Sequence, residues 1–140
     1  MAGYSGTPLW KKLGIGPGDR LAIGKAPPGF EIADLPPEVE VRQRISGAFD
    51  VMLLFFTRRA ELERRFPLLL RALDVAGGLW IAWPKRAAGV ASDITEDVVR
   101  EVALPTGMVD NKVCAIDDTW SGLRLVLRRE LRTGRTSAAS

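Results

Sequence analysis

The chain has 140 residues, 46% of them hydrophobic and 26% charged, which is enough for one domain with a core and excludes a disordered chain. It has no histidine and one cysteine, Cys114, so histidine catalysis, a Cys/His zinc site and an internal disulfide are excluded. Positions 1–120 hold 15 basic and 16 acidic residues, whereas positions 121–140 hold five arginines and one glutamate. The net charge of +3 therefore belongs to the C-terminal end, and without a broad basic face we expect no nucleic-acid partner.

The sequence also argues against a membrane location. Its longest uninterrupted apolar stretch, residues 51–56, is far shorter than the ~20 residues of a membrane-spanning helix. The N-terminal residues include no apolar segment of the kind found in a signal peptide. We therefore expect a cytoplasmic α/β domain over residues 1–130, with no membrane partner, followed by a basic, disordered tail over residues 131–140.

The first half of the chain predicts one short helix and three strands. Thr7 as N-cap, Pro8 at the first helical position and Gly14 at the C-terminal end predict a helix that packs on the core. Apolar runs predict strands over residues 20–24, 39–41 and 50–56. Only about seven residues separate the last two strands, so the second is either very short and parallel or forms a hairpin with the third. We favour the short parallel strand.

The second half alternates helices with strands. Thr57 followed by an apolar stripe predicts a helix that Pro67 kinks or breaks and that Gly77-Gly78 ends. A second helix begins at Thr95 and ends near residues 105–107. The predicted strands are residues 78–83, 112–116 and 123–127, of which the last two form a closing hairpin.

Trp80 lies in the predicted strand 78–83, whose residues are apolar on both faces. Such a strand is typical of the centre of a covered sheet, so we expect Trp80 to be in the core. Cys114 lies between apolar neighbours, and we expect an inert thiol rather than a nucleophile.

Alternating strands and helices predict a single-domain, mostly parallel sheet with helical crossovers and a C-terminal antiparallel hairpin. This arrangement resembles a reduced class I methyltransferase (Rossmann-like) fold. The resemblance implies a glycine-rich turn after the first strand and an acid ending the second. Here Pro27 and Pro28 remove two backbone donors from that turn, and the second strand ends near Arg42-Gln43-Arg44 without an acid. We therefore predict no cofactor and no binding of S-adenosylmethionine.

The predicted loops bring cations and aromatic rings to the carboxyl ends of the strands, where open α/β sheets bind ligands. The candidate ligand-binding residues are Lys25, Arg58, Arg59, Trp83, Lys85, Arg86, Asp118 and Trp120. A helix N-terminus beside such cations favours a small anion. Alternatively, these side chains only solvate the loops and cover the core, and Asp93, Asp117 or Asp118 neutralises the cations. We favour this internal partner, predict that Asp117-Asp118 forms a turn, and assign no catalytic or metal residue.

Several long segments resemble a bacterial, mainly actinobacterial, family known as domain of unknown function 3052. They are Ala2-Gly3-Tyr4-Ser5-Gly6-Thr7-Pro8-Leu9, Trp83-Pro84-Lys85, Asp118-Thr119-Trp120-Ser121-Gly122-Leu123-Arg124, and residues 11–15, 93–102, 109–110 and 112–115. The resemblance implies one short cytoplasmic domain and carries over no activity or catalytic residue. Asn111 departs from the apolar residue that the family tends to have there.

Two functional hypotheses follow from the sequence. The first is a non-catalytic adaptor or regulatory module that acts through a protein partner or through self-association. The alternative is a binder of a small anionic ligand, or an enzyme, that uses the cationic residues at the strand ends.

Overall fold

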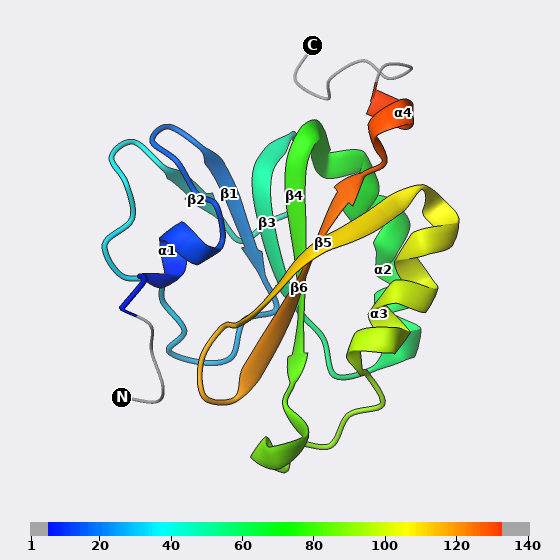
Figure 1. Ribbon diagram of the computed structural model, residues 1–140. Coiled ribbons are helices and arrows are strands. Elements are labelled where there is room, and N and C mark those ends of the chain that lie inside the picture. The colour runs from blue at the N-terminus through cyan, green and yellow to red at the C-terminus, as the bar shows by residue number, and fades with distance from the viewer. Residues whose placement is uncertain (1–5, 133–140) are drawn as a thin grey trace.

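Six strands form one sheet in the order β2-β1-β3-β4-β6-β5 in the computed structural model, which describes residues 6–132 (Figure 1). The strands are β1 (Arg20–Gly24), β2 (Glu40–Arg42), β3 (Phe49–Phe55), β4 (Leu73–Pro84), β5 (Met108–Ala115) and β6 (Trp120–Leu127). Strands β1 to β4 run parallel to one another, and β6 runs antiparallel to both β4 and β5. The predicted mostly parallel sheet with a C-terminal hairpin is confirmed.

Helices cover the two faces of this sheet unequally. The helices are α1 (Leu9–Lys12), α2 (Arg59–Ala72), α3 (Glu96–Ala103) and α4 (Arg129–Arg132), with short 3-10 turns η1 (Arg86–Ala88) and η2 (Leu104–Thr106). Helices α2 and α3 lie together on one face, whereas the other face carries the short α1 and the connection between β1 and β2 (Figure 1). Leu131 and Arg132, the first two residues of the predicted tail, are the last two residues of α4. The rest of that tail lies outside the described residues.

Side chains alternate between these faces along each strand, so the sheet separates two cores. Met52, Leu54 and Ile81 face α2 and α3 in the larger core. Leu53 and Trp80 face the other way, toward Leu13 and other residues at the N-terminal end. This pattern is the physical reason that β3 and β4 are apolar throughout: both faces of each strand are covered.

Trp80 ties the N-terminal helix to the middle of the sheet. Its side chain is fully buried, and its indole Nε1–H donates a hydrogen bond of 3.0 Å to the carbonyl oxygen of Leu13. The strand that carries it, β4, lies between β3 and β6 in the interior of the sheet. The predictions of a core tryptophan and of a helix packed on the core are confirmed.

The short parallel form of β2 is also confirmed. Glu40 to Arg42 pair in parallel with Arg20 to Ala22 of β1. The following segment, residues 43–48, returns across the α2 side of β1, where Ile45 packs against the larger core. Gly24 lies under this crossing, because a Cβ there would be 2.2 Å from Leu54 Cδ1 and 3.9 Å from Ile45 Cδ1.

Two predicted helix starts are wrong, and the break that the sequence allowed at Pro67 is absent. Helix α1 begins at Leu9, with Pro8 rather than Thr7 at the N-cap and no capping side chain. Helix α2 begins at Arg59, after Arg58 rather than Thr57, and does not break at Pro67. The proline is exposed, so the carbonyl that loses its partner lies on the solvent side of the helix, where water can satisfy it.

Gly77 and Gly78 lie inside β4 and do not end α2. Strand β4 starts directly after the helix, and its pairing with β3 shifts register between Phe49 and Val51. A Cβ on Gly77 would be 2.8 Å from the carbonyl oxygen of Asp50, so glycine is required here by the close approach of two strands. The dipeptide therefore marks a bulge rather than a helix terminus.

Arg20 and Asp50 form an ion pair at the start of β1 and β3, and this pair gives a testable pH dependence. Arg20 donates from Nε and Nη2 to the Asp50 carboxylate at 2.9 Å each, and its backbone N–H donates to the same group at 2.8 Å. Hydrogen bonding to Arg20 lowers the pKa of Asp50 below its ordinary value. The pair therefore stabilises the fold above the unfolded pKa of about 4, and this contribution is lost as the pH falls further.

We expect Asp50→Asn to lower the free energy of unfolding by about 1–2 kcal/mol at pH 7, because it weakens charge-assisted bonds in a partly exposed pair. The difference from wild type should shrink as the pH falls below about 4. Urea unfolding at pH 7 and pH 3 measures both quantities. Asp118→Asn is the control, since Asp118 is exposed and we expect that change to leave stability unaltered. An Asp50→Asn deficit that persists unchanged at pH 3 would contradict the assignment.

Candidate functional site

Two of the five cations predicted at the strand ends, Lys25 and Arg59, pair with carboxylates of the chain itself. Lys25 Nζ lies 2.6 Å from a carboxylate oxygen of Glu61. Arg59 donates to Glu63 at 2.9 Å and to Glu101 at 2.7 Å. The anion-binding position at the start of α2 is filled as well, because the backbone N–H of Arg59 donates to Asp93 Oδ1 at 2.7 Å. The chain thus supplies internal partners, but the predicted aspartates are the wrong ones: Glu61, Glu63 and Glu101 pair with the cations, and Asp93 accepts only a backbone N–H.

The two predicted site tryptophans lie on opposite faces of the sheet. Trp83 is buried in the core beside α2 and α3. Trp120 packs on the other face, where its ring meets Phe55 edge-on with centroids 5.1 Å apart. The side chains therefore cannot line one site: Trp120 is paired with Pro84, and successive residues of a strand, here Trp83 and Pro84, point to opposite faces.

The other predicted residues lie in the loops without forming a common pocket. Arg58 precedes α2, Arg86 starts η1, and Asp118 lies in the β5–β6 turn, all three exposed. Lys85 follows β4, and its backbone N–H donates to the carbonyl of Thr119 at 2.7 Å.

The adjacent aspartate, Asp117, forms the turn that the sequence predicts. Its Oδ1 accepts hydrogen bonds from the backbone N–H groups of Thr119 and Trp120, each at 2.8 Å. This is the local hydrogen bonding by which aspartate stabilises turns.

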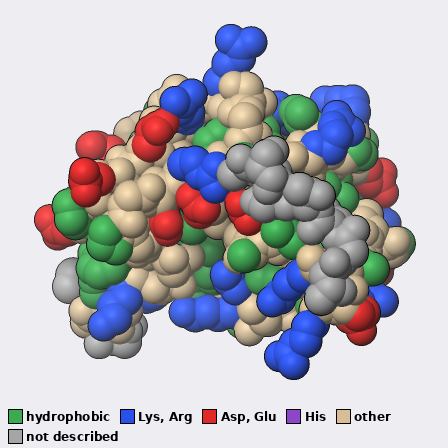
Figure 2. All heavy atoms as spheres, turned by 90° about the horizontal axis from the view of Figure 1, so that it is seen from above, with side chains coloured by type: hydrophobic (Ala, Val, Ile, Leu, Met, Phe, Trp, Pro, Cys, Tyr) green, Lys and Arg blue, Asp and Glu red, His purple; other side chains and the backbone are tan. Residues whose placement is uncertain are grey.

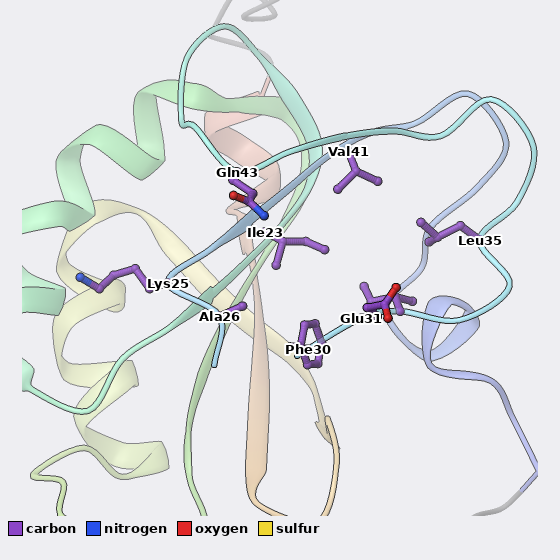
Figure 3. A pocket seen from close by; sticks show the side chains of 9 residues that line it. Ile23, Lys25, Ala26, Phe30, Glu31, Leu35, Val41 and Gln43 are labelled. Atoms are coloured by element: carbon purple, nitrogen blue, oxygen red, sulfur yellow. The ribbon is translucent and has the colours of Figure 1, made fainter. Parts of the chain in front are cut away.

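The more promising concavity is a cleft of about 420 Å³ at the carboxyl ends of β1 and β2 (Figure 3). Its lining residues are Ile23, Lys25, Ala26, Phe30, Glu31, Ile32, Leu35, Val41 and Gln43. Of the residues singled out in the sequence, only Lys25 is among them, and its side chain is turned away toward Glu61 (Figure 3).

This cleft exists because the connection from β1 to β2 contains no helix. The connection turns sharply at Pro27-Pro28-Gly29-Phe30, where the Phe30 N–H donates to the Pro27 carbonyl at 3.1 Å. Gly29 has φ +79°, the left-handed conformation that the third position of a type II turn requires. The turn sets the Phe30 ring edge-on against Phe55, with centroids 4.9 Å apart, and the chain then runs past the sheet instead of covering it.

The walls of the cleft combine apolar side chains with polar groups. Ile23 from β1, Val41 from β2 and Leu35 from the connection line it together (Figure 3). Val41 is 45% exposed, which leaves apolar surface uncovered in a concave place. Glu31 and Gln43 make no side-chain hydrogen bond or ion pair with the part of the chain that the structure describes, so their oxygen and nitrogen atoms are free to meet a ligand. The arrangement suits a flat apolar ring that carries hydroxyl or amide groups.

The cleft was not predicted from the sequence, because the predicted site was built on clustered cationic residues at the strand ends. The available signals were an apolar residue on a short edge strand, a polar side chain directly after it, and a crossover too short for a helix. Each is weak alone, and only the folded chain brings Val41, Gln43 and Phe30 around one space.

Residues 6–132 give little support for a metal site, a reactive thiol or a membrane-spanning helix. No group of three or more Cys, Asp or Glu side chains there is arranged to hold a metal ion. Burial raises the pKa of the half-buried Cys114 thiol, which disfavours the reactive thiolate at neutral pH. Over the same residues, every helix is too short or too polar to span a membrane.

Neither known protein families nor curated proteins match this sequence, and the resemblance to domain of unknown function 3052 stays a prediction. Solved structures do match its fold. A methyltransferase dependent on S-adenosylmethionine (SAM) from Aquifex aeolicus has a TM-score of 0.59 at 14% identity, covering 84% of this chain and 86% of that one. Magnesium protoporphyrin IX methyltransferase from Synechocystis PCC 6803, with bound SAM, has a TM-score of 0.56 at 10% identity, covering 79% and 71%. The fibrillarin pre-rRNA processing protein of Methanococcus jannaschii has a TM-score of 0.53 at 11% identity, covering 87% and 69%.

These comparisons correct the functional hypotheses drawn from the sequence. The leading hypothesis, a non-catalytic adaptor or regulatory module, is wrong as the first choice, because the structures of similar fold are SAM-dependent methyltransferases. The alternative, a binder or enzyme acting on a small anion at the strand ends, loses part of its basis. Carboxylates already pair with Lys25 and Arg59, and Asp93 fills the helix terminus. The chain has the fold of the SAM-dependent methyltransferases, reduced to a six-stranded sheet.

Proposed function

We propose that the cleft at the ends of β1 and β2 binds a nucleoside, with adenosine as the first candidate. One observation carries the proposal: an open, partly apolar cleft lies at the carboxyl ends of parallel strands, where sheets of this type bind their ligands. Two structures of similar fold contain SAM or S-adenosylhomocysteine, and both ligands carry an adenosine group. The proposal takes from them the class of ligand and no reaction.

The apolar walls account for the base. A purine or pyrimidine ring placed between Ile23, Val41 and Leu35 removes apolar surface from water on both sides of the ring. It also covers Val41, which is otherwise 45% exposed on a three-residue edge strand. The volume of about 420 Å³ is in the range of small-molecule sites.

The polar groups account for the sugar and for the edge of the base. The Glu31 carboxylate can accept hydrogen bonds from two neighbouring hydroxyl groups of a ribose. Gln43, directly after β2, offers both an amide donor and a carbonyl acceptor. In this arrangement Glu31 supplies the carboxylate that the methyltransferase resemblance leads one to expect at the end of the second strand, where this sequence has none.

The turn after β1 restricts what the nucleoside carries. Pro27 and Pro28 have no backbone N–H, and the N–H of Phe30 is already bonded to the Pro27 carbonyl. A charged 5′ substituent therefore finds few backbone donors at this turn. We accordingly retain the prediction that SAM does not bind at micromolar concentration, while adenosine does.

Isothermal titration calorimetry with adenosine and SAM tests the proposal. We expect adenosine to bind, Glu31→Gln to weaken it by about tenfold (1.4 kcal/mol), and Val41→Glu to abolish it by placing a charge against the base. The matched control is Glu38→Gln, an exposed change in the same connection that does not line the cleft.

Two results would contradict different parts of the proposal. No heat with 1 mM adenosine, or equal affinity in Glu31→Gln and wild type, would remove the nucleoside site. A micromolar dissociation constant for SAM would instead show that the prolines leave room and donors for the methionyl group.

A further inference from the structure

A second pocket, independent of the nucleoside cleft, lies between the end of α1 and the β5–β6 hairpin, and we propose that it binds a phosphate group. It has a volume of about 260 Å³, and strands β3 and β4 separate it from the cleft at β1 and β2. Its lining residues are Lys11, Lys12, Leu13, Gly14, Asn111, Lys112 and Arg124. Four of them are cations and none is a carboxylate. Seen from above, several basic side chains lie along the lower edge of the molecule (Figure 2).

Arg124 is half-buried and has no acidic partner among the residues that the structure describes. Three half-buried arginines elsewhere in the fold do make ion pairs, each with at least two carboxylates. They are Arg20, Arg59 and Arg100. No carboxylate among residues 6–132 lies within ion-pair distance of Arg124. The sequence outside that range, residues 1–5 and 133–140, contains no aspartate or glutamate to supply one.

The fold makes room for this guanidinium. Arg124 on β6 lies across from β4, where a Cβ on Gly78 would be 2.5 Å from Arg124 Nε and 2.8 Å from Nη2. The group therefore occupies the space that a side chain at position 78 would fill. Burial lowers the pKa of Arg124, and the nearby positive charge of Arg132 adds to the effect. A cation held in this way is stabilised by an anion from outside the chain.

The neighbours of Arg124 suit phosphate. Lys112 is paired with Arg124 across β5 and β6, and its Nζ donates to the carbonyl oxygen of Lys12 at 2.9 Å, which holds the ammonium at the rim of the pocket. The fork of an arginine binds two phosphate oxygens at once, and lysines add charge around it. Asn111 adds an amide donor. Without an aromatic side chain in the lining on which a base could stack, the pocket suits a free phosphorylated molecule better than a nucleic acid strand.

Calorimetry with inorganic pyrophosphate at low ionic strength tests this assignment. We expect wild type to bind with a submillimolar dissociation constant and Arg124→Met to bind at least tenfold more weakly. Arg124→Met keeps the length of the stem and removes the unpaired charge, so its melting temperature without ligand should equal or exceed that of wild type. Lys112→Met, an exposed change that does not threaten folding, should also weaken binding. Arg86→Met is the matched control: it removes an exposed arginine outside the pocket and should change nothing.

Three results would overturn the assignment. If the wild-type protein does not bind pyrophosphate, the site does not exist. If Arg86→Met weakens pyrophosphate binding as much as Arg124→Met does, the anion is attracted only by the net positive charge of the protein. Tighter binding of a single-stranded oligonucleotide than of pyrophosphate would identify a nucleic-acid surface instead. Adenosine binding in the Arg124→Met variant should stay as in wild type, which distinguishes a failure here from a failure of the nucleoside cleft.

Discussion

Replacing Trp80 by alanine is expected to lower the free energy of unfolding by about 3–5 kcal/mol, the usual cost of emptying a large buried aromatic site. The ring is fully buried on the face that α1 covers, next to Gly122, where a Cβ would be 3.2 Å from the indole. Its loss leaves a cavity and also removes the hydrogen bond to the Leu13 carbonyl. Urea unfolding followed by circular dichroism measures the change.

Two companion variants separate these contributions. Trp80→Phe keeps most of the ring and removes the donor, so we expect a loss of about 1–2 kcal/mol from the unpaired Leu13 carbonyl. Trp120→Ala is the control, because this ring is only half-buried at the end of the sheet and its removal should cost less than that of Trp80. A loss below about 1 kcal/mol for Trp80→Ala would mean that the ring is exposed and that β4 is not central.

Phe66→Ala is expected to cost about 3–5 kcal/mol as well, in the other core. Phe66 lies in α2 directly before Pro67, is 2% exposed and packs against the larger core between the sheet and the helices. A loss below about 1 kcal/mol would mean that Phe66 does not pack in this core.

The control for this prediction is Leu68→Ala. Leu68 is 38% exposed on the same helix, so its truncation should cost less than about 1 kcal/mol in the same unfolding experiment. Similar losses for Phe66→Ala and Leu68→Ala would contradict the helix geometry. Because Phe66 and Trp80 lie in cores on opposite faces of the sheet, their effects are expected to be independent.

The candidate sites show where residue patterns mislead. The cluster of cations predicted at the strand ends exists in the sequence, but Lys25 and Arg59 reach carboxylates on α2 and α3 that are 36 and 42 residues away. Strand β6, near the C-terminal end, contributes Arg124 to a different pocket. The other cations of that pocket come from residues 11, 12 and 112. Charge along the chain indicated neither outcome, because pairing depends on distances between segments that are remote in sequence.

The local and periodic features of this protein could be predicted from its sequence. The apolar runs of β1, β3 and β4, the capped start of α3 at Thr95, and the hairpin turn at Asp117 follow from side-chain chemistry within a few residues. Such features depend on neighbours along the chain, and the class of fold follows from their order.

The end of α2, the need for Gly77 in β4, and the polar groups left without partners among residues 6–132 depend on contacts between distant segments. Gly77 is explained by the carbonyl of Asp50 on a neighbouring strand, and the open cleft by a crossover that leaves Val41 uncovered. The exceptional position of Arg124 follows from the absence of any carboxylate within reach in residues 6–132. These properties arise from strand order and register, which bring remote residues together and which no local pattern encodes.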